Sequence, residues 1–158
     1  MKKKYGRRNF INTAIAGGIG LGLSNSFSAL YAQSGASQKR IGIIGLDTSH
    51  SIAFTKALNA AGASADFKGY KVVAAYPKGS NDIISSAERI PGYTEEVKKL
   101  GVEIVSSIKE LLKKTDYILL ETNDGRLHLQ QALEVIKAGK PMFIDKPIAA
   151  SLKDAVAI

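Results

Sequence analysis

The chain has 158 residues, 45% hydrophobic and 23% charged, which is the composition of a globular protein of about one domain. It contains no cysteine, so disulfides, thiolate metal sites and a cysteine nucleophile are excluded. The net charge of +8 comes largely from five basic residues that precede Gln33. The remaining chain has a net charge of +3 and no basic stripe, so it gives no reason to expect a nucleic-acid partner.

Residues 1–32 have the three parts of an export signal: a basic start, an apolar stretch from Thr13 to Leu23, and a tail of small and polar residues. The apolar stretch is too short for a membrane anchor. The segment from Arg7 to Ile11 (RRNFI) resembles the twin-arginine signal, in which two arginines are followed by any residue, a phenylalanine and an aliphatic residue. The resemblance implies that the twin-arginine export machinery carries the folded protein to the periplasm or another extracytoplasmic space.

We expect a signal peptide and linker over residues 1–36 and one nucleotide-binding domain over residues 37–158. Signal cleavage is compatible with a site after Ala32 or after Ala36. At the other end, Ser151 and Asp154 are placed like the N-cap and N3 residues of a helix that runs to Ile158. The chain stops inside this predicted helix, so we expect it to be a fragment of a longer protein.

Short apolar runs alternate with helical patterns after the linker, which predicts a Rossmann-like, doubly wound parallel sheet of the α/β class. In such sheets ligands bind at the carboxyl ends of the strands, so the loops after Gly45, Tyr76, Glu121 and Asp145 are the candidate binding loops. The strands are expected at 40–45, 71–76, 102–105, 117–121 and 141–145, and the helices at 49–61, 94–100, 108–113 and 126–138.

The loop after the first strand meets the requirements of a dinucleotide-binding fingerprint only in part. Gly45 supplies the first glycine, which makes the tight turn, but Asp47 and His50 stand where the second and third glycines belong. A carboxylate at position 47 would repel and crowd a pyrophosphate. The helix start with Thr48 and Ser49 would still attract an anion.

The loop after the second strand has no acidic residue at the strand end, where a carboxylate usually accepts the ribose hydroxyls of NAD. Lys78 and Ser80 are candidates to hold the additional phosphate of NADP instead. NADP and NAD are therefore both retained as candidate cofactors. The alternative is a polar loop with a solvated lysine.

The segment from Ala138 to Pro147 (AGKPMFIDKP) resembles the Gfo/Idh/MocA family of sugar and polyol oxidoreductases, with Asp145 in place of the family's glutamate before Lys-Pro. The segment from Leu120 to Asn123, followed by His128, is similar to the family's Thr-Pro segment and its helix-starting histidine. The resemblance covers residues 40–158, which correspond to the family's N-terminal domain and to none of its C-terminal α+β substrate domain.

The resemblance implies an NAD(P)-dependent oxidoreductase that acts on a sugar or polyol, or an NAD-dependent glycosidase of the same family, and a homo-oligomer at full length. Lys146 would be the catalytic residue, because the matching lysine lies by the nicotinamide and the substrate and can assist proton loss. The alternatives are a surface lysine that neutralises Asp145, and a structural role for His128 rather than one in orienting Asn123 or the cofactor. The implied cofactor-binding residues, together with those argued from the loops, are Gly45, Thr48, Ser49, Lys78, Thr122, Asn123, Asp145, Lys146 and Pro147.

Two further interpretations stay open beside the oxidoreductase. Asp47, His50, Glu121 and Asp145 all lie at or just beyond predicted strand ends, and carboxylates with one imidazole suit a divalent metal. No pair of these residues has a distinctive metal-ligand spacing, so the dinucleotide interpretation is preferred. The other alternative is a non-catalytic binding module that has kept the fold but has an altered phosphate loop.

Overall fold

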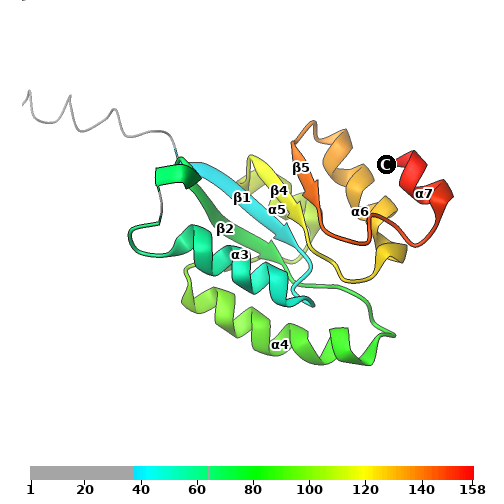
Figure 1. Cartoon of the computed structure of the whole chain (residues 1–158), viewed down its shortest axis with the longest axis horizontal. Helices are drawn as coiled ribbons and strands as arrows, with labels where there is room; N and C mark the ends of the chain where they lie inside the picture. Colours follow the sequence, from blue (N-terminus) through cyan, green and yellow to red (C-terminus); the bar gives the residue numbers. More distant parts are fainter. Residues whose placement is uncertain (1–37, 64) are drawn as a thin grey trace, which may run out of the picture. The chain divides into compact units, whose positions relative to one another are not determined.

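The computed structural model describes residues 38–63 and 65–158, and the predicted twin-arginine signal lies outside them. The described chain forms a five-stranded, fully parallel sheet in the order β3-β2-β1-β4-β5 (Figure 1). The strands are β1 (Lys39–Ile44), β2 (Tyr70–Tyr76), β3 (Glu103–Ile104), β4 (Tyr117–Leu120) and β5 (Met142–Ile144). The helices are α3 (Ser49–Asn59), the 3₁₀ turn η1 (Ala65–Phe67), α4 (Ile84–Lys99), α5 (Ile108–Lys114), α6 (Gly125–Lys137) and α7 (Leu152–Ala157).

Two apolar clusters lie on opposite faces of the sheet, as expected when helices cover both faces of parallel strands. On one face Ile43 and Val72 pack with Ile52 of α3 and Val97 of α4. On the other face side chains of β1, β2 and β4 pack with those of α5 and α6. Because β1 and β4 are neighbours and the chain winds outward from them in both directions, the strand order reverses between these two strands. That reversal is where open α/β sheets bind ligands.

The predicted fold class is confirmed, and all five predicted strands are present with ends shifted by at most one residue. The predicted helix at 94–100 is wrong in its start, because α4 begins at Ile84 and runs through Pro91. A proline inside a helix leaves the carbonyl four residues earlier without its N–H partner. Here that carbonyl belongs to Ala87, which is exposed, so water can satisfy it. The helix therefore tolerates a residue that usually ends or kinks a helix.

The predicted last helix is present as α7, and the Ser151 hydroxyl accepts a hydrogen bond from the Asp154 N–H at 3.1 Å, as a capping residue should. Among the described residues, no helix is at once long enough and apolar enough to span a membrane.

Candidate functional site

Gly45 makes the tight turn that ends β1. It has a φ of +91°, and a side chain here would place its Cβ 2.6 Å from the backbone of Thr122. Only glycine adopts this conformation without strain, and only glycine leaves room for the loop after β4. The turn therefore brings the β1 and β4 loops into direct contact at the point where the strand order reverses.

The Asp47 side chain is completely buried and lies between three loops. Its Oδ1 accepts a hydrogen bond from the backbone N–H of Asn123 at 3.1 Å, and its Oδ2 is so close to Gly79 that a Cβ there would lie 2.1 Å away. Burial raises the pKa of this carboxyl above its ordinary value, against the opposing effect of the Asn123 and Ser80 N–H groups. Asp47 thus joins the loops after β1, β2 and β4 from within the crevice.

Arg126, at the start of α6, holds the loop after β2 from outside. Its guanidinium donates to Asp82 at 2.5 Å, to Asp124 at 2.6 Å and to the Ser80 hydroxyl at 3.3 Å. Hydrogen bonds from Arg126, and from Ser80 in turn, hold the pKa of Asp82 far below its ordinary value. This network, which the sequence analysis missed, closes the β2 loop onto α6.

These contacts decide how well a dinucleotide fits. A dinucleotide crosses such a sheet with its pyrophosphate at the first loop and its adenosine toward the second strand. The turn at Gly45 and the start of α3 suit a pyrophosphate. However, Asp47 fills the space between the loops after β1, β2 and β4, and Arg126 holds the β2 loop by hydrogen bonds. The adenosine half of a dinucleotide would meet Asp47 and the loop that Arg126 holds.

Lys146, His50 and Asp145 form a contact cluster beyond the ends of β1 and β5. His50 Nδ1 lies 2.6 Å from Asp145 Oδ2, and Lys146 Nζ lies 3.3 Å from His50 Nδ1 and 3.4 Å from Asp145 Oδ2. Burial tends to raise the pKa of Asp145, but the Lys146 N–H and the His50 side chain outweigh it, so this pKa lies below its ordinary value. Asp145 is therefore an ionised acceptor between two nitrogen groups.

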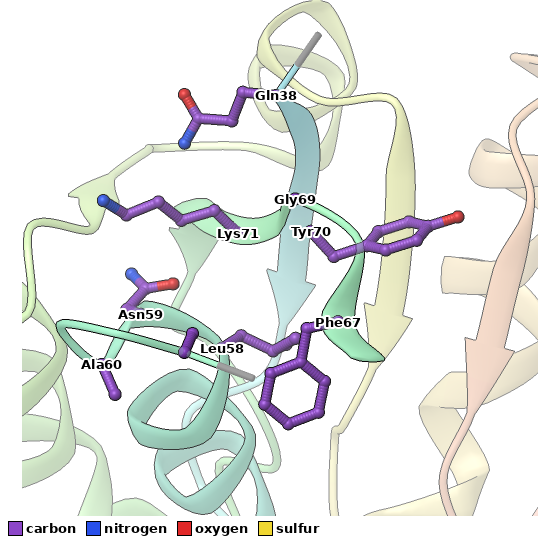
Figure 2. A pocket seen from close by; sticks show the side chains of 9 residues that line it. Gln38, Leu58, Asn59, Ala60, Phe67, Gly69, Tyr70 and Lys71 are labelled. Atoms are coloured by element: carbon purple, nitrogen blue, oxygen red, sulfur yellow. The ribbon is translucent and has the colours of Figure 1, made fainter. Parts of the chain in front are cut away.

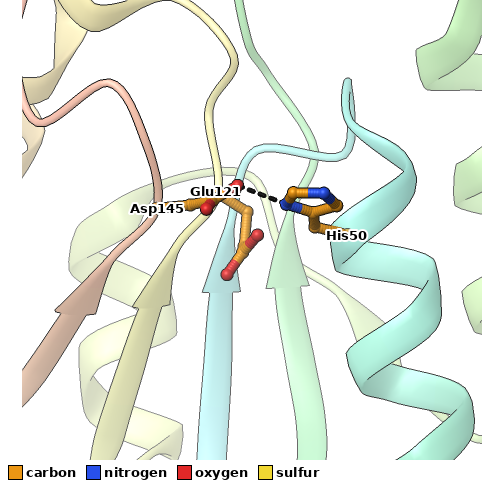
Figure 3. Close-up of side chains that lie close together, drawn as sticks. All are labelled: His50, Glu121 and Asp145. Atoms are coloured by element: carbon orange, nitrogen blue, oxygen red, sulfur yellow. Dashed lines mark hydrogen bonds and ion pairs between the residues drawn. The ribbon is translucent and has the colours of Figure 1, made fainter.

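Glu121 follows β4 and completes this cluster from below (Figure 3). Its side chain is fully buried, and neither carboxylate oxygen has a hydrogen-bond partner. Burial, together with the nearby negative charge of Asp145, raises the pKa of Glu121 to about 7. An unpaired buried carboxylate of this kind is unusual in a folded protein and requires a physical explanation.

The other predicted site residues differ in burial and in hydrogen bonding. Thr48 caps α3 by accepting from the His50 N–H at 3.3 Å, and Ser49 is exposed beside it. Thr122 is buried under Gly45, and its hydroxyl has no hydrogen-bond partner. Lys78 is exposed and lines a separate cavity of about 200 Å³ beside α6, while Pro147 is exposed after Lys146.

His128 takes a structural position. It is buried, with Nε2 2.6 Å from the Thr122 carbonyl and Nδ1 3.1 Å from the Ile148 carbonyl. It therefore ties the β4 loop to the segment after β5, and it reaches neither the Asn123 side chain nor the contact cluster.

A cavity of about 290 Å³ lies at the opposite edge of the sheet (Figure 2). Its lining includes Asn59, whose side-chain amide bonds the backbone of Val72 and the Leu100 carbonyl. Tyr70 and Lys71 line it at the amino end of β2. Because ligands of parallel sheets bind at the carboxyl ends, this cavity is a gap between structural elements rather than the functional site.

The parallel sheet, its strand order and the polar side chains at its carboxyl edge define a Rossmann-like nucleotide-binding domain. The sequence model of the Gfo/Idh/MocA family, described as an oxidoreductase family with an NAD-binding Rossmann fold, matches residues 39–158. The chain belongs to this family.

Solved structures with the same fold include three oxidoreductases. UDP-N-acetylglucosamine 3-dehydrogenase GnnA from Acidithiobacillus ferrooxidans is 20% identical, with a TM-score of 0.55, and the match covers 75% of this chain and 31% of that one. The WlbA dehydrogenase from Bordetella pertussis, in complex with NADH and UDP-GlcNAcA, is 21% identical, with a TM-score of 0.56 and coverages of 76% and 32%. An oxidoreductase from Agrobacterium radiobacter, in complex with NAD+, L-tartaric acid and magnesium, is 18% identical, with a TM-score of 0.57 and coverages of 77% and 31%.

At these identities the likeness establishes the fold. The matched region spans about a third of the length of these structures. A comparison with curated proteins gave no significant match.

Proposed function

We propose that the chain is the nucleotide-binding part of a longer, exported oxidoreductase that acts on a sugar or polyol with NAD or NADP. The observation that carries this proposal is the position of Lys146 in the contact cluster at the carboxyl edge of the sheet, in a chain of an NAD-binding oxidoreductase family. The carbohydrate-type substrate is supported by the sugar-nucleotide dehydrogenases among the similar structures.

Lys146 has the exposure and the partners that proton transfer requires. Its side chain is 74% exposed, so the amine can reach a substrate hydroxyl, while Asp145 and His50 lie within 3.4 Å of its nitrogen. In its neutral form the amine would accept the hydroxyl proton as the carbon is oxidised. The Asp145 carboxylate would stabilise the ammonium that results, and His50 would offer a second proton carrier.

The closed crevice sets a condition on cofactor binding. The β2 loop must move away from Asp47 and Arg126 before an adenosine group can enter, so binding includes the cost of breaking the contacts of Asp47 with Gly79 and Ser80 and of Arg126 with Asp82. Lys78 lies on this loop and is exposed, which suits contact with the additional phosphate of NADP once the loop has moved.

A longer chain is supported by the apolar surface near the carboxyl end. Of the eight exposed large hydrophobic side chains among the described residues, four follow the start of β5: Phe143, Ile148, Leu152 and Val156. Exposed apolar groups in this density mark surfaces that another domain or subunit covers. We propose that the substrate domain of the longer protein covers them, and that the longer protein is a homo-oligomer.

Fluorescence titration of the 158-residue chain with NADH and NADPH tests cofactor binding. We expect both to bind, and the Asp47→Gly variant to bind them at least about ten-fold more tightly, because the repelling carboxylate is gone. Lys78→Ala should weaken NADPH binding and leave NADH binding unchanged. Failure of both cofactors to bind both the original chain and Asp47→Gly would contradict the proposal.

A second candidate function is favoured by Asp47 itself. If the crevice stays closed, the domain is a non-catalytic binding module that keeps the fold of its family. In that case Asp47→Gly restores binding of NADH whereas the original chain binds neither cofactor.

A further inference from the structure

The structure places one imidazole and two carboxylates around a common point at the carboxyl edge of the sheet. His50 comes from the first turn of α3, Glu121 from the end of β4 and Asp145 from the end of β5. One ligand atom from each residue lies within 4.8 Å of one from each of the others. Figure 3 shows His50 and Asp145 approaching from opposite sides with Glu121 between them. Asp47, the fourth residue of the sequence-based metal hypothesis, faces Gly79 and Asn123 and is not part of this group.

The buried carboxylate of Glu121, which has no hydrogen-bond partner, is the observation that points to a ligand. Its side chain has no solvent exposure, and both of its oxygens lack hydrogen-bond partners in the described structure. A buried carboxylate without a partner costs several kcal/mol if it is charged. Asp145 beside it adds like-charge repulsion. A divalent cation between the two carboxylates would remove both costs at once.

We propose that His50, Glu121 and Asp145 form a binding site for a divalent transition-metal ion of the Zn²⁺ type. Imidazole and carboxylate donors together suit Zn²⁺, Mn²⁺ or Fe²⁺, whereas Mg²⁺ and Ca²⁺ prefer oxygen alone. The site leaves at least one coordination position open toward the crevice, which is the arrangement of sites that bind water or a substrate oxygen.

The distances are within reach of a bound ion. Metal–ligand bonds of about 2.0–2.2 Å place neighbouring donor atoms roughly 3–3.5 Å apart. The 2.6 Å contact between His50 and Asp145 must therefore lengthen slightly, and separations near 4.8 Å must shorten.

Lys146 supplies the positive charge next to Asp145. Because its side chain is 74% exposed, it can swing into solvent when a metal ion binds. The ammonium and the metal ion would thus be alternative counter-ions for the same carboxylates.

Zn²⁺ binding to the 158-residue chain, measured by isothermal titration calorimetry after EDTA treatment, tests this site. We expect one Zn²⁺ per chain and clearly weaker binding of Mg²⁺. Residues 1–37 contain no histidine, cysteine, aspartate or glutamate, and both nitrogens of His128 already face carbonyls, so other side-chain sites of this kind are scarce. Glu121→Gln and His50→Ala should each weaken Zn²⁺ binding at least about ten-fold.

The matched control is Glu103→Gln, which removes an exposed carboxylate that pairs with Lys114 on the β3 edge. It should bind Zn²⁺ like the original chain. His50→Ala keeps the test decisive if Glu121→Gln does not fold, because His50 is partly exposed. Absence of Zn²⁺ binding, or binding that neither variant weakens, would overturn the site. The measurement contains no dinucleotide, so its outcome is independent of the proposed oxidoreductase function.

Discussion

The unusual features of this chain are mainly single residues at the carboxyl edge of the sheet. Asp47 and Glu121 are buried carboxylates, and the pKa of each is raised mainly by burial. Gly45 and Gly79 have no side chain where a Cβ would collide with a neighbouring loop. The crevice is therefore specified by a few positions at which charge and side-chain size are both constrained.

Glu121 should make stability depend on pH. A carboxyl whose pKa rises on folding from 4.5 to about 7 leaves stability unchanged below pH 4.5 and lowers it progressively as the pH rises to 7. In EDTA, Glu121→Gln should therefore be more stable than the original chain by about 1–3 kcal/mol at pH 8 and no more stable at pH 4. Urea unfolding at both pH values measures this, with Glu103→Gln as the control. Equal stability of both proteins at pH 8 would refute it.

Gly45 should be intolerant of any side chain. Gly45→Ala combines a φ of +91° with a Cβ that would lie 2.6 Å from Thr122, so we expect a loss of at least about 2 kcal/mol in unfolding free energy. Gly139→Ala is the matched control, because its φ is +64° but nothing lies within 4 Å of the added Cβ. It should lose only about 1–2 kcal/mol. Similar losses for both variants would show that the contact with Thr122 is unimportant.

Between elements, the loop from β2 to α4 decides whether the crevice is open. On its inner side Gly79 lies against the Asp47 carboxyl, which also accepts from the Ser80 N–H, and on its outer side Arg126 of α6 holds Asp82. Both attachments use hydrogen bonds and charges at the sheet edge rather than apolar packing. Such contacts can break and re-form without disturbing the core.

Arg126→Ala should free this loop at a modest cost to the whole protein. Amide hydrogen exchange in residues 77–83 should become faster. The unfolding free energy should fall by about 1–3 kcal/mol, because the ion pair with Asp82 is exposed but Asp124 is only 6% exposed and would lose its charged partner. Exchange measured by mass spectrometry tests this. Arg40→Ala, which breaks the ion pair with Asp116 at the other edge, should leave exchange in this loop unchanged. An unaltered loop in Arg126→Ala would show that Asp47 alone holds it.

At the scale of the whole molecule, the described domain has an apolar core on each face of its sheet, but exposed apolar side chains near its carboxyl end. Leu152 and Val156 of α7 are 82% and 79% exposed. A chain with this surface free should self-associate.

Replacing both residues with lysine should lower the sedimentation coefficient of the 158-residue chain at high concentration, because the apolar contacts are removed and charge is added. Ile84→Lys, at an equally exposed position at the start of α4, should have no such effect. A chain that is monomeric at every concentration would contradict this expectation.

The sequence by itself determined the fold class, the five strands and the N-cap of the last helix, and it predicted the edge at which the candidate site lies, because apolar periodicity and turn residues are local signals. It also indicated that the phosphate loop departs from the dinucleotide-binding fingerprint, since Asp47 replaces a glycine. It did not predict the first ten residues of α4, because Pro91 and Gly92 are break signals that an exposed helix can override. Only the tertiary structure decided that Asp47 turns toward the β2 loop while His50, Glu121 and Asp145 converge, and that Arg126 closes the crevice. Those contacts join residues up to 95 positions apart, and their geometry depends on strand order and side-chain packing that no local pattern encodes.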